Sequence, residues 1–180
     1  NGDRGLTKYH YEGFVDLSAY DVSDDWIVSF QKNLRAYVLE TTFLDVDQEP
    51  YYAEALINNK DVTCNSSVVF SSSKGPIVRA CISESTSYPM NSSDVNGDEL
   101  RYSFISSRAD AATDVLYKTG FSPLRPVSLS ENIAISSDGL ITLNATTPNQ
   151  QGITDLKVEE YRNGKLVGSV TRGIQVSTFT

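Results

Sequence analysis

The chain has 180 residues, of which 39% are hydrophobic and 10% aromatic, so it can bury the core of one large or two small domains. Its 15 Lys and Arg residues against 23 Asp and Glu residues give a net charge of −8, which argues against a nucleic-acid partner because phosphate binding needs concentrated basic side chains. No apolar run reaches the roughly 18 residues of a membrane span, and without an initiating Met or a signal peptide we expect a processed protein or an excised fragment.

Strand signals recur at short intervals along the chain and long helical periodicity is hard to find, so we predict an all-β fold. Residues 1–62 are expected to form a smaller N-terminal β domain with Trp26 in its core. Four strands are few for an independent sandwich, so this part either folds as a small domain or leans on its neighbour. The strands predicted in it are 10–17, 25–30, 35–44 and 51–57.

Residues 63–180 carry about seven strands in about 115 residues, which is the size of an immunoglobulin-like β-sandwich. The last two strands flank Asn163 and Gly164, the strongest short hairpin signal, because both central residues of that turn must accept positive φ. The strand segments predicted here are 68–70, 77–82, 100–105, 115–117, 133–135, 140–143, 153–161 and 165–176.

The most informative motif places Asp94, Asn96 and Asp98 at alternate positions of a turn that leads directly into the strand at 100–105. Gly97 lacks a Cβ and permits the tight curl that would let these oxygen donors converge on one hard cation such as Ca2+. The alternative is an ordinary solvated turn, since Asp, Asn and Gly dominate turns for local reasons alone. Calcium is the only cofactor that we expect.

Cys64 and Cys81 are the only cysteines, in a chain rich in Ser, Thr, Asn and Tyr as secreted β-proteins are. They are separated by 16 residues and flank two strand signals around a turn at 71–76, so we predict a disulfide that cross-links neighbouring strands in an oxidising compartment. A loop of this size would stabilise the fold by about 3 kcal/mol. The alternative is two free thiols that are buried as small hydrophobic groups.

The run from Glu159 to Val176 resembles a segment that recurs in large Bacteroidetes cell-surface proteins, including gliding-motility-associated adhesins exported by the type IX secretion system. The motif at 94–104 is similar to the cadherin-like pattern in which an Asp-x-Asx-Gly-Asp turn precedes a Leu-x-Tyr-Ser strand. Further pieces resemble the same proteins in the expected order, at 16–18 with 26–29, 51–55, 65–70, Cys81, 117–123 and 138–141.

This resemblance implies a cadherin-like or immunoglobulin-like repeat module on the outside of the cell, whose partners are neighbouring modules of the same polypeptide. One position departs from the family, because Gly173 stands where an Asp often follows Arg172. If that Asp supplies a ligand or a turn contact, the calcium site of this copy is weak or lost.

Catalysis has little support in the sequence. His10 is the only histidine and lies between two tyrosines near the start, which argues against a Ser-His-Asp or Cys-His arrangement. Paired carboxylates for glycoside hydrolysis could be drawn from several acidic residues, but such residues are common in so acidic a chain, and we interpret them as a solvated face: Asp45, Asp47, Glu49, Glu54, Glu159 and Glu160. We therefore expect no enzyme.

Our leading interpretation is a non-catalytic structural or adhesive module of a large secreted surface adhesin or filament, related to gliding motility. A lectin-like module that holds surface polysaccharide through exposed tyrosines is one alternative. Adjacent Tyr51 and Tyr52 must point to opposite faces of a strand, so we expect one in the core and the other exposed, where its ring can stack on a sugar. A self-assembling filament subunit is the other alternative, with residues 165–176 as the edge strand that recruits further copies.

Overall fold

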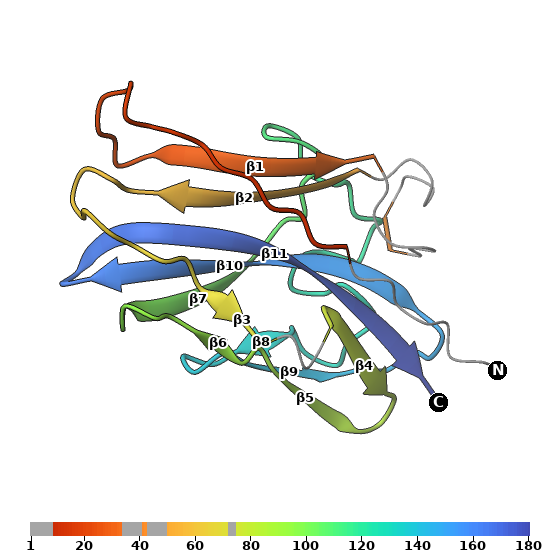
Figure 1. Ribbon diagram of the computed structural model, residues 1–180. Coiled ribbons are helices and arrows are strands. Elements are labelled where there is room, and N and C mark those ends of the chain that lie inside the picture. Colours follow the sequence, from red (N-terminus) through yellow and green to blue (C-terminus); the bar gives the residue numbers. More distant parts are fainter. Residues whose placement is uncertain (1–8, 34–40, 43–49, 72–74) are drawn as a thin grey trace.

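The structure is a computed structural model that describes residues 9–33, 41–42, 50–71 and 75–180. Every regular element in these ranges is a β-strand, and no helix there is long and apolar enough to cross a membrane (Figure 1). The strands are β1 (Trp26–Lys32), β2 (Tyr51–Ile57), β3 (Val69–Phe70), β4 (Ile77–Cys81), β5 (Ser85–Pro89), β6 (Ser92–Ser93), β7 (Glu99–Ile105), β8 (Ala134–Ile135), β9 (Leu140–Asn144), β10 (Gln151–Arg162) and β11 (Lys165–Phe179).

The main sheet has six strands, in the order β1-β2-β11-β10-β7, and β4 pairs with the last five residues of β11. The β4–β11 pair is parallel and the other pairs are antiparallel. β10 and β11 form one long hairpin, whose turn has positive φ at both Asn163 and Gly164 as the Asn-Gly signal predicts. This hairpin is the centre of the sheet.

A second layer, made of the three-stranded sheet β5-β9-β8 and the pair β3-β6, packs on one face of the main sheet (Figure 1). The core lies between the two layers, where Leu156, Val158, Ile174 and Val176 of the main sheet meet Ile141 of β9. The alternating apolar residues of β7 pack against this core as their period of two predicts. The all-β fold is confirmed, and two packed layers are consistent with a β-sandwich.

β1 and β2 continue the main sheet beyond the second layer, and no residue of either strand belongs to the buried apolar cluster described above. β2 joins β11 through only three register pairs, Ala55–Ile57 with Gly168–Val170. Strands from both expected domains therefore share one sheet, and the boundary at residue 62 stays a prediction. Trp26 is half-buried and lies outside the buried cluster, so the expectation that it anchors a core is wrong.

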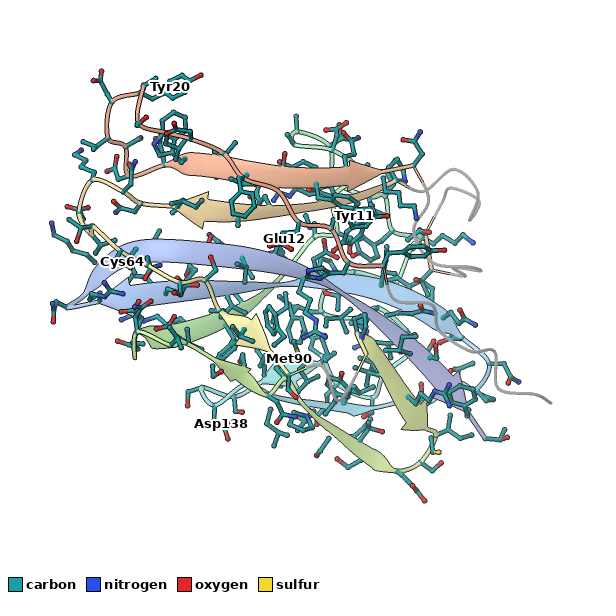
Figure 2. The ribbon with its side chains drawn as sticks, viewed as in Figure 1. Tyr11, Glu12, Tyr20, Cys64, Met90 and Asp138 are labelled. Atoms are coloured by element: carbon teal, nitrogen blue, oxygen red, sulfur yellow. The ribbon has the colours of Figure 1, made fainter. Side chains whose placement is uncertain are left out.

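The segment before β1 crosses the front of β1 and β2 without joining the sheet (Figure 2). It contacts them through rings, since Tyr11 lies 5.3 Å from Phe30 and Tyr20 meets Trp26 edge-on at 5.6 Å, both between ring centroids. The strand predicted at 10–17 is wrong, because these residues have apolar character but form no strand pairing with any other described part of the chain.

Most other predicted strands are confirmed within a residue or two. The strand predicted at 115–117 is wrong, since only an isolated bridge from Thr42 to Tyr117 forms there. The one predicted at 35–44 falls largely outside the described residues. The sequence does not predict β5 and β6, because segments rich in Ser and Thr and interrupted by Pro and Asn are typical of loops. Residues 165–176 are not an edge, since β11 has neighbours on both sides.

Candidate cation site

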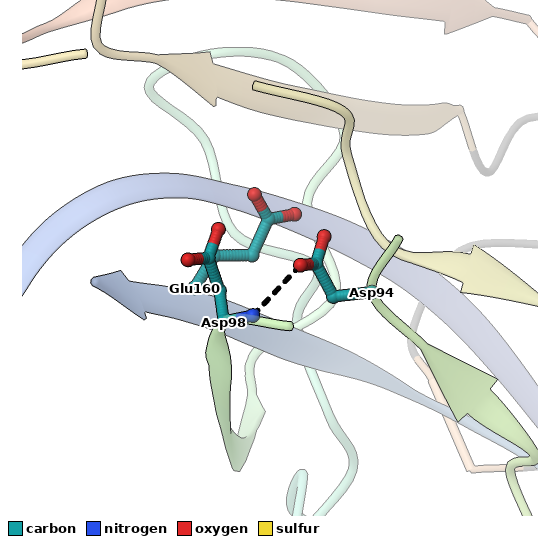
Figure 3. A group of neighbouring side chains, drawn as sticks. All are labelled: Asp94, Asp98 and Glu160. Atoms are coloured by element: carbon teal, nitrogen blue, oxygen red, sulfur yellow. Dashed lines mark hydrogen bonds between the residues drawn. The ribbon is translucent and has the colours of Figure 1, made fainter. Parts of the chain in front are cut away.

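Three carboxylates meet where the turn before β7 lies beside the far end of β10 (Figure 3). Asp94 and Asp98 come from the turn and Glu160 comes from β10, and one oxygen of each lies within 4.8 Å of the other two. Glu160 is 0% exposed and the side chain of Asp98 is 2% exposed, while Asp94 is half-buried. The structure thus brings together two of the residues predicted from the sequence, Asp94 and Asp98, and adds Glu160, for which the sequence predicts a solvated position.

The turn folds as its sequence predicts. Gly97 has φ of +78°, in the left-handed region that favours glycine. The backbone N–H of Asp98 donates to Oδ1 of Asp94, with 2.8 Å between the nitrogen and the oxygen, so the first side chain of the motif closes the turn. This bond uses one oxygen of Asp94 and leaves Oδ2 directed elsewhere.

Asn96 is engaged outside the carboxylate group. Its side chain is exposed, and Oδ1 accepts a hydrogen bond of 2.8 Å from the backbone N–H of Ser66. It therefore fastens the turn to the segment that leads into β3. The oxygen donor that joins Asp94 and Asp98 in this structure is Glu160.

The carboxylate of Glu160 is held in place from two sides. Oε1 accepts a hydrogen bond from the backbone N–H of Val68, and Oε2 accepts one from the side-chain amide of Asn65, both at 2.7 Å. Glu160 faces Gly168 on β11, where an added Cβ would overlap Oε2. A glycine at this position leaves room for the carboxylate in the sheet.

The electrostatic environment of Glu160 disfavours its charge. Burial is the largest effect and raises the pKa of Glu160, and the neighbouring charges of Asp94 and Asp98 raise it further, against the two hydrogen bonds, which lower it. Without a counter-ion the group therefore holds a proton more strongly than an ordinary glutamate does.

Arg162 supplies the positive charge beside the cluster. Its Nε and one terminal nitrogen donate to the two oxygens of Asp98 at 2.7 and 2.8 Å, a bidentate pair, and further bonds reach Asn65 and the carbonyl of Cys64. With all three carboxylates ionised, the charges of −3 and +1 sum to −2. A single divalent cation would neutralise this cluster.

The remaining oxygen of Asp94, Oδ2, is buried and lacks a hydrogen-bond partner among the described residues. A buried carboxylate oxygen without a partner costs free energy, and carboxylates are the ligands that Ca2+ prefers. The arrangement suits a calcium ion held by Asp94, Asp98 and Glu160, or a proton shared between two of them.

Gly173 lies away from this cluster. It pairs with Asp155 on β10, five residues beyond Gly168 and so about 16 Å along β11, and an added Cβ would lie 2.9 Å from Cε2 of Tyr51. An Asp at this position would face Asp155 and the Tyr51 ring. Its absence removes no ligand from the carboxylate cluster.

The predicted disulfide between Cys64 and Cys81 is wrong, and both residues are free and exposed. Cys64 lies beside the β10–β11 turn (Figure 2). Cys81 pairs with Phe179 at the other end of β11. The length of β11 puts them on the order of 40 Å apart, whereas a disulfide needs Cα atoms within about 7 Å. The intervening β3 pairs with β6 instead of β4, which carries the two cysteines apart.

Other sequence candidates find ordinary structural roles. Glu54 forms an ion pair with Arg108 at 2.5 Å and accepts a hydrogen bond from the hydroxyl of Tyr52, and Glu159 pairs with Lys157. Tyr52 is buried, and Tyr51 is half-buried rather than exposed. His10 is exposed, and the carboxylates Asp45, Asp47 and Glu49 fall outside the described residues.

Comparison of the sequence with protein-family models and with curated proteins gives no match. The geometry of the carboxylate cluster is therefore the structural basis for a functional proposal.

Proposed function

We propose that this chain is a non-catalytic structural module of a large secreted surface adhesin, built as an immunoglobulin- or cadherin-like sandwich, and that Asp94, Asp98 and Glu160 bind Ca2+. The observation that carries the proposal is the buried, unpartnered Oδ2 of Asp94 in a cluster of net charge −2. The resemblance to gliding-motility-associated adhesins supports the extracellular location and the adhesive role, with neighbouring modules of the same polypeptide as partners.

A cation at this site would act mechanically. Asp94 and Asp98 belong to the turn between β6 and β7, whereas Glu160 lies in the central hairpin and holds Asn65 and Val68 of the segment before β3. One ion would therefore join two stretches of chain that are distant in sequence, and Glu160 already holds a third through its hydrogen bonds to Asn65 and Val68. Such a cross-link stiffens one end of the sandwich without adding hydrophobic core, which suits a module that transmits load.

Calcium binding is measured by calorimetry, together with thermal unfolding in Ca2+ and in EDTA. An extracellular site of this kind is expected to have a Kd of about 10⁻⁴ to 10⁻³ M. At about 10 mM Ca2+ the unfolding free energy would then rise by about 1.4 to 2.7 kcal/mol. No heat and equal melting temperatures in Ca2+ and EDTA would remove calcium from the proposal.

Asp94→Asn sharpens this test. The new amide keeps Oδ1, which accepts from the N–H of Asp98, and replaces the unpartnered Oδ2 with an NH2 group that can donate to Glu160. We expect the variant to lose the calcium response and to melt above the wild type in EDTA. Asp138→Asn is the matched control, because Asp138 accepts a bond from the Ser136 hydroxyl in an exposed turn, and it should keep the full response.

A lectin-like function has one observation in its favour. Tyr9, Tyr11 and Tyr20 are exposed on the segment that crosses β1 and β2, and a tyrosine ring offers an apolar face for sugar stacking while its hydroxyl stays in water. Binding on a polysaccharide or glycan array that disappears when the three are changed to Ala would favour this function. Array binding that survives those changes would place sugar recognition elsewhere.

A further inference from the structure

Two edges of the main sheet, β1 and β7, differ strongly in character, and β4, which pairs with β11, forms a third. β7 carries Glu99 and Arg101, which are exposed and form an ion pair at 2.8 Å, so its edge is protected by charge in the usual way. β1 has one charge only, Lys32, at its last position. Its other side chains include Ile27, Val28 and Phe30, all exposed. Long apolar edges of this kind are templates for pairing with another strand.

The backbone of β1 is satisfied on one side only. All seven residues of β1 pair with β2, and no other backbone hydrogen bond in the described part of the chain involves them. The segment before β1 crosses its face through the Tyr11–Phe30 and Tyr20–Trp26 ring contacts, which leave the outer N–H and C=O groups free. Among the described residues, the outer edge is thus a seven-residue ladder without a backbone partner.

We propose that β1 pairs antiparallel with β1 of a second copy of this chain, in a register centred on Ser29, so that the two main sheets continue across a two-fold axis. This register pairs all seven residues of each strand. Val28 then faces Phe30 of the second copy, a β-branched and aromatic pair of the kind that stabilises sheets. Trp26 faces Lys32, which suits a cation over an indole ring.

Charge selects a second copy as the occupant. β1 contains no carboxylate, although the chain as a whole carries −8, so pairing here brings no acidic residues face to face within the strands. The same register sets Lys32, the one cationic side chain of the strand, opposite Trp26 of the other copy. The complementary contact occurs twice, once at each end, as a two-fold interface requires. This inference is independent of the cation site, and its failure would leave the calcium proposal untouched.

Analytical ultracentrifugation of the full chain tests the interface. A dimer is expected to form as the concentration rises through the micromolar range. Val28→Glu should raise the dimer dissociation constant at least tenfold. Val69→Glu, on β3, is the matched control and should leave it unchanged, because the two valines have similar exposure, 51% for Val28 and 58% for Val69. A wild type that stays monomeric, a series of larger polymers, or a V28E dimer as tight as the wild type would overturn the proposal. Circular dichroism checks that both variants fold.

Cysteine cross-linking tests the register, in a background in which Cys64 and Cys81 are Ser. Ser29→Cys places two thiols directly opposite each other, where neighbouring Cα atoms lie about 4.5 to 5.5 Å apart, so oxidation should give a covalent dimer. Gln31→Cys puts the thiols four residues apart along the strands, about 13 Å, and should not cross-link. Equal cross-linking by the two variants, or more by Q31C, would overturn the register.

Discussion

The two halves of the main sheet share one hydrogen-bonded ladder but differ in what covers them. β10 and β11 are packed by the second layer on one face and by loops on the other, so that β10 is buried over most of its length. β1 continues the same sheet, yet six of its seven residues are exposed. Strand pairing alone therefore does not make a core: the apolar area removed from water, at about 25 cal/mol per Å², decides which half stabilises the fold.

The largest expected difference between the halves is in the cost of truncating a side chain. Leu156→Ala removes a fully buried side chain from the core and should lower the unfolding free energy by about 2 to 5 kcal/mol. Val28→Ala, in β1, should cost about 0.5 kcal/mol or less when measured on the dilute monomer. Urea unfolding followed by circular dichroism measures both. Equal costs would mean that β1 is buried as deeply as β10, and the comparison would fail.

A smaller effect is expected from adding one methyl group. Gly168→Ala should cost about 1 to 3 kcal/mol, because the new Cβ displaces the Glu160 carboxylate from its hydrogen bonds with Val68 and Asn65. Gly13→Ala, in the segment that crosses β1, meets no atom within 4 Å and should change the unfolding free energy by about 0.5 kcal/mol at most. Urea titration of the two variants side by side gives the difference. An unchanged unfolding free energy for Gly168→Ala would show that the Glu160 carboxylate can adopt another position without loss of stability.

The same contrast explains how far the sequence could be read. Alternation and turn chemistry predicted β2, β7 and the β10–β11 hairpin, because those signals are local. They misled at 10–17, where apolar residues recur but no strand of the described ranges pairs with them. Whether a strand is paired and covered depends on chain segments distant in sequence, which a single sequence does not display.

The residues of the candidate site also differ in whether local sequence predicts them. Asp94, Gly97 and Asp98 form one local turn, and their role was predicted from spacing. Glu160 was not singled out, because it reaches the cluster through the register of β10 against β7 and through the space left by Gly168. One signal did exist in the sequence. The period of two that puts Leu156 and Val158 in the core also puts Glu160 on that buried face.

The smallest expected effect is a pH dependence that separates the buried cluster from the exposed carboxylates. Hydrogen bonds lower the pKa of exposed groups such as Asp138, so what they contribute to stability is present at neutral pH and is lost only as the pH falls below their ordinary range. Glu160 acts in the opposite direction. Its pKa is raised in the folded chain, so its contribution is fully present below the ordinary value of 4.5 and is lost as the pH rises through the raised value.

In EDTA the unfolding free energy should therefore fall as the pH rises from about 4.5 towards neutrality, a window in which exposed carboxylates of lowered pKa, such as Asp138, are already ionised. Saturating Ca2+ should flatten this slope, because a cation stabilises the ionised form of Glu160. Asp94→Asn should flatten it as well, since it removes one of the two charges that raise the pKa of Glu160. Urea unfolding at fixed ionic strength across this pH range measures the slope. A stability that rises with pH in EDTA would show that Glu160 is ionised at no cost, and the buried cluster would then need neither a cation nor a proton.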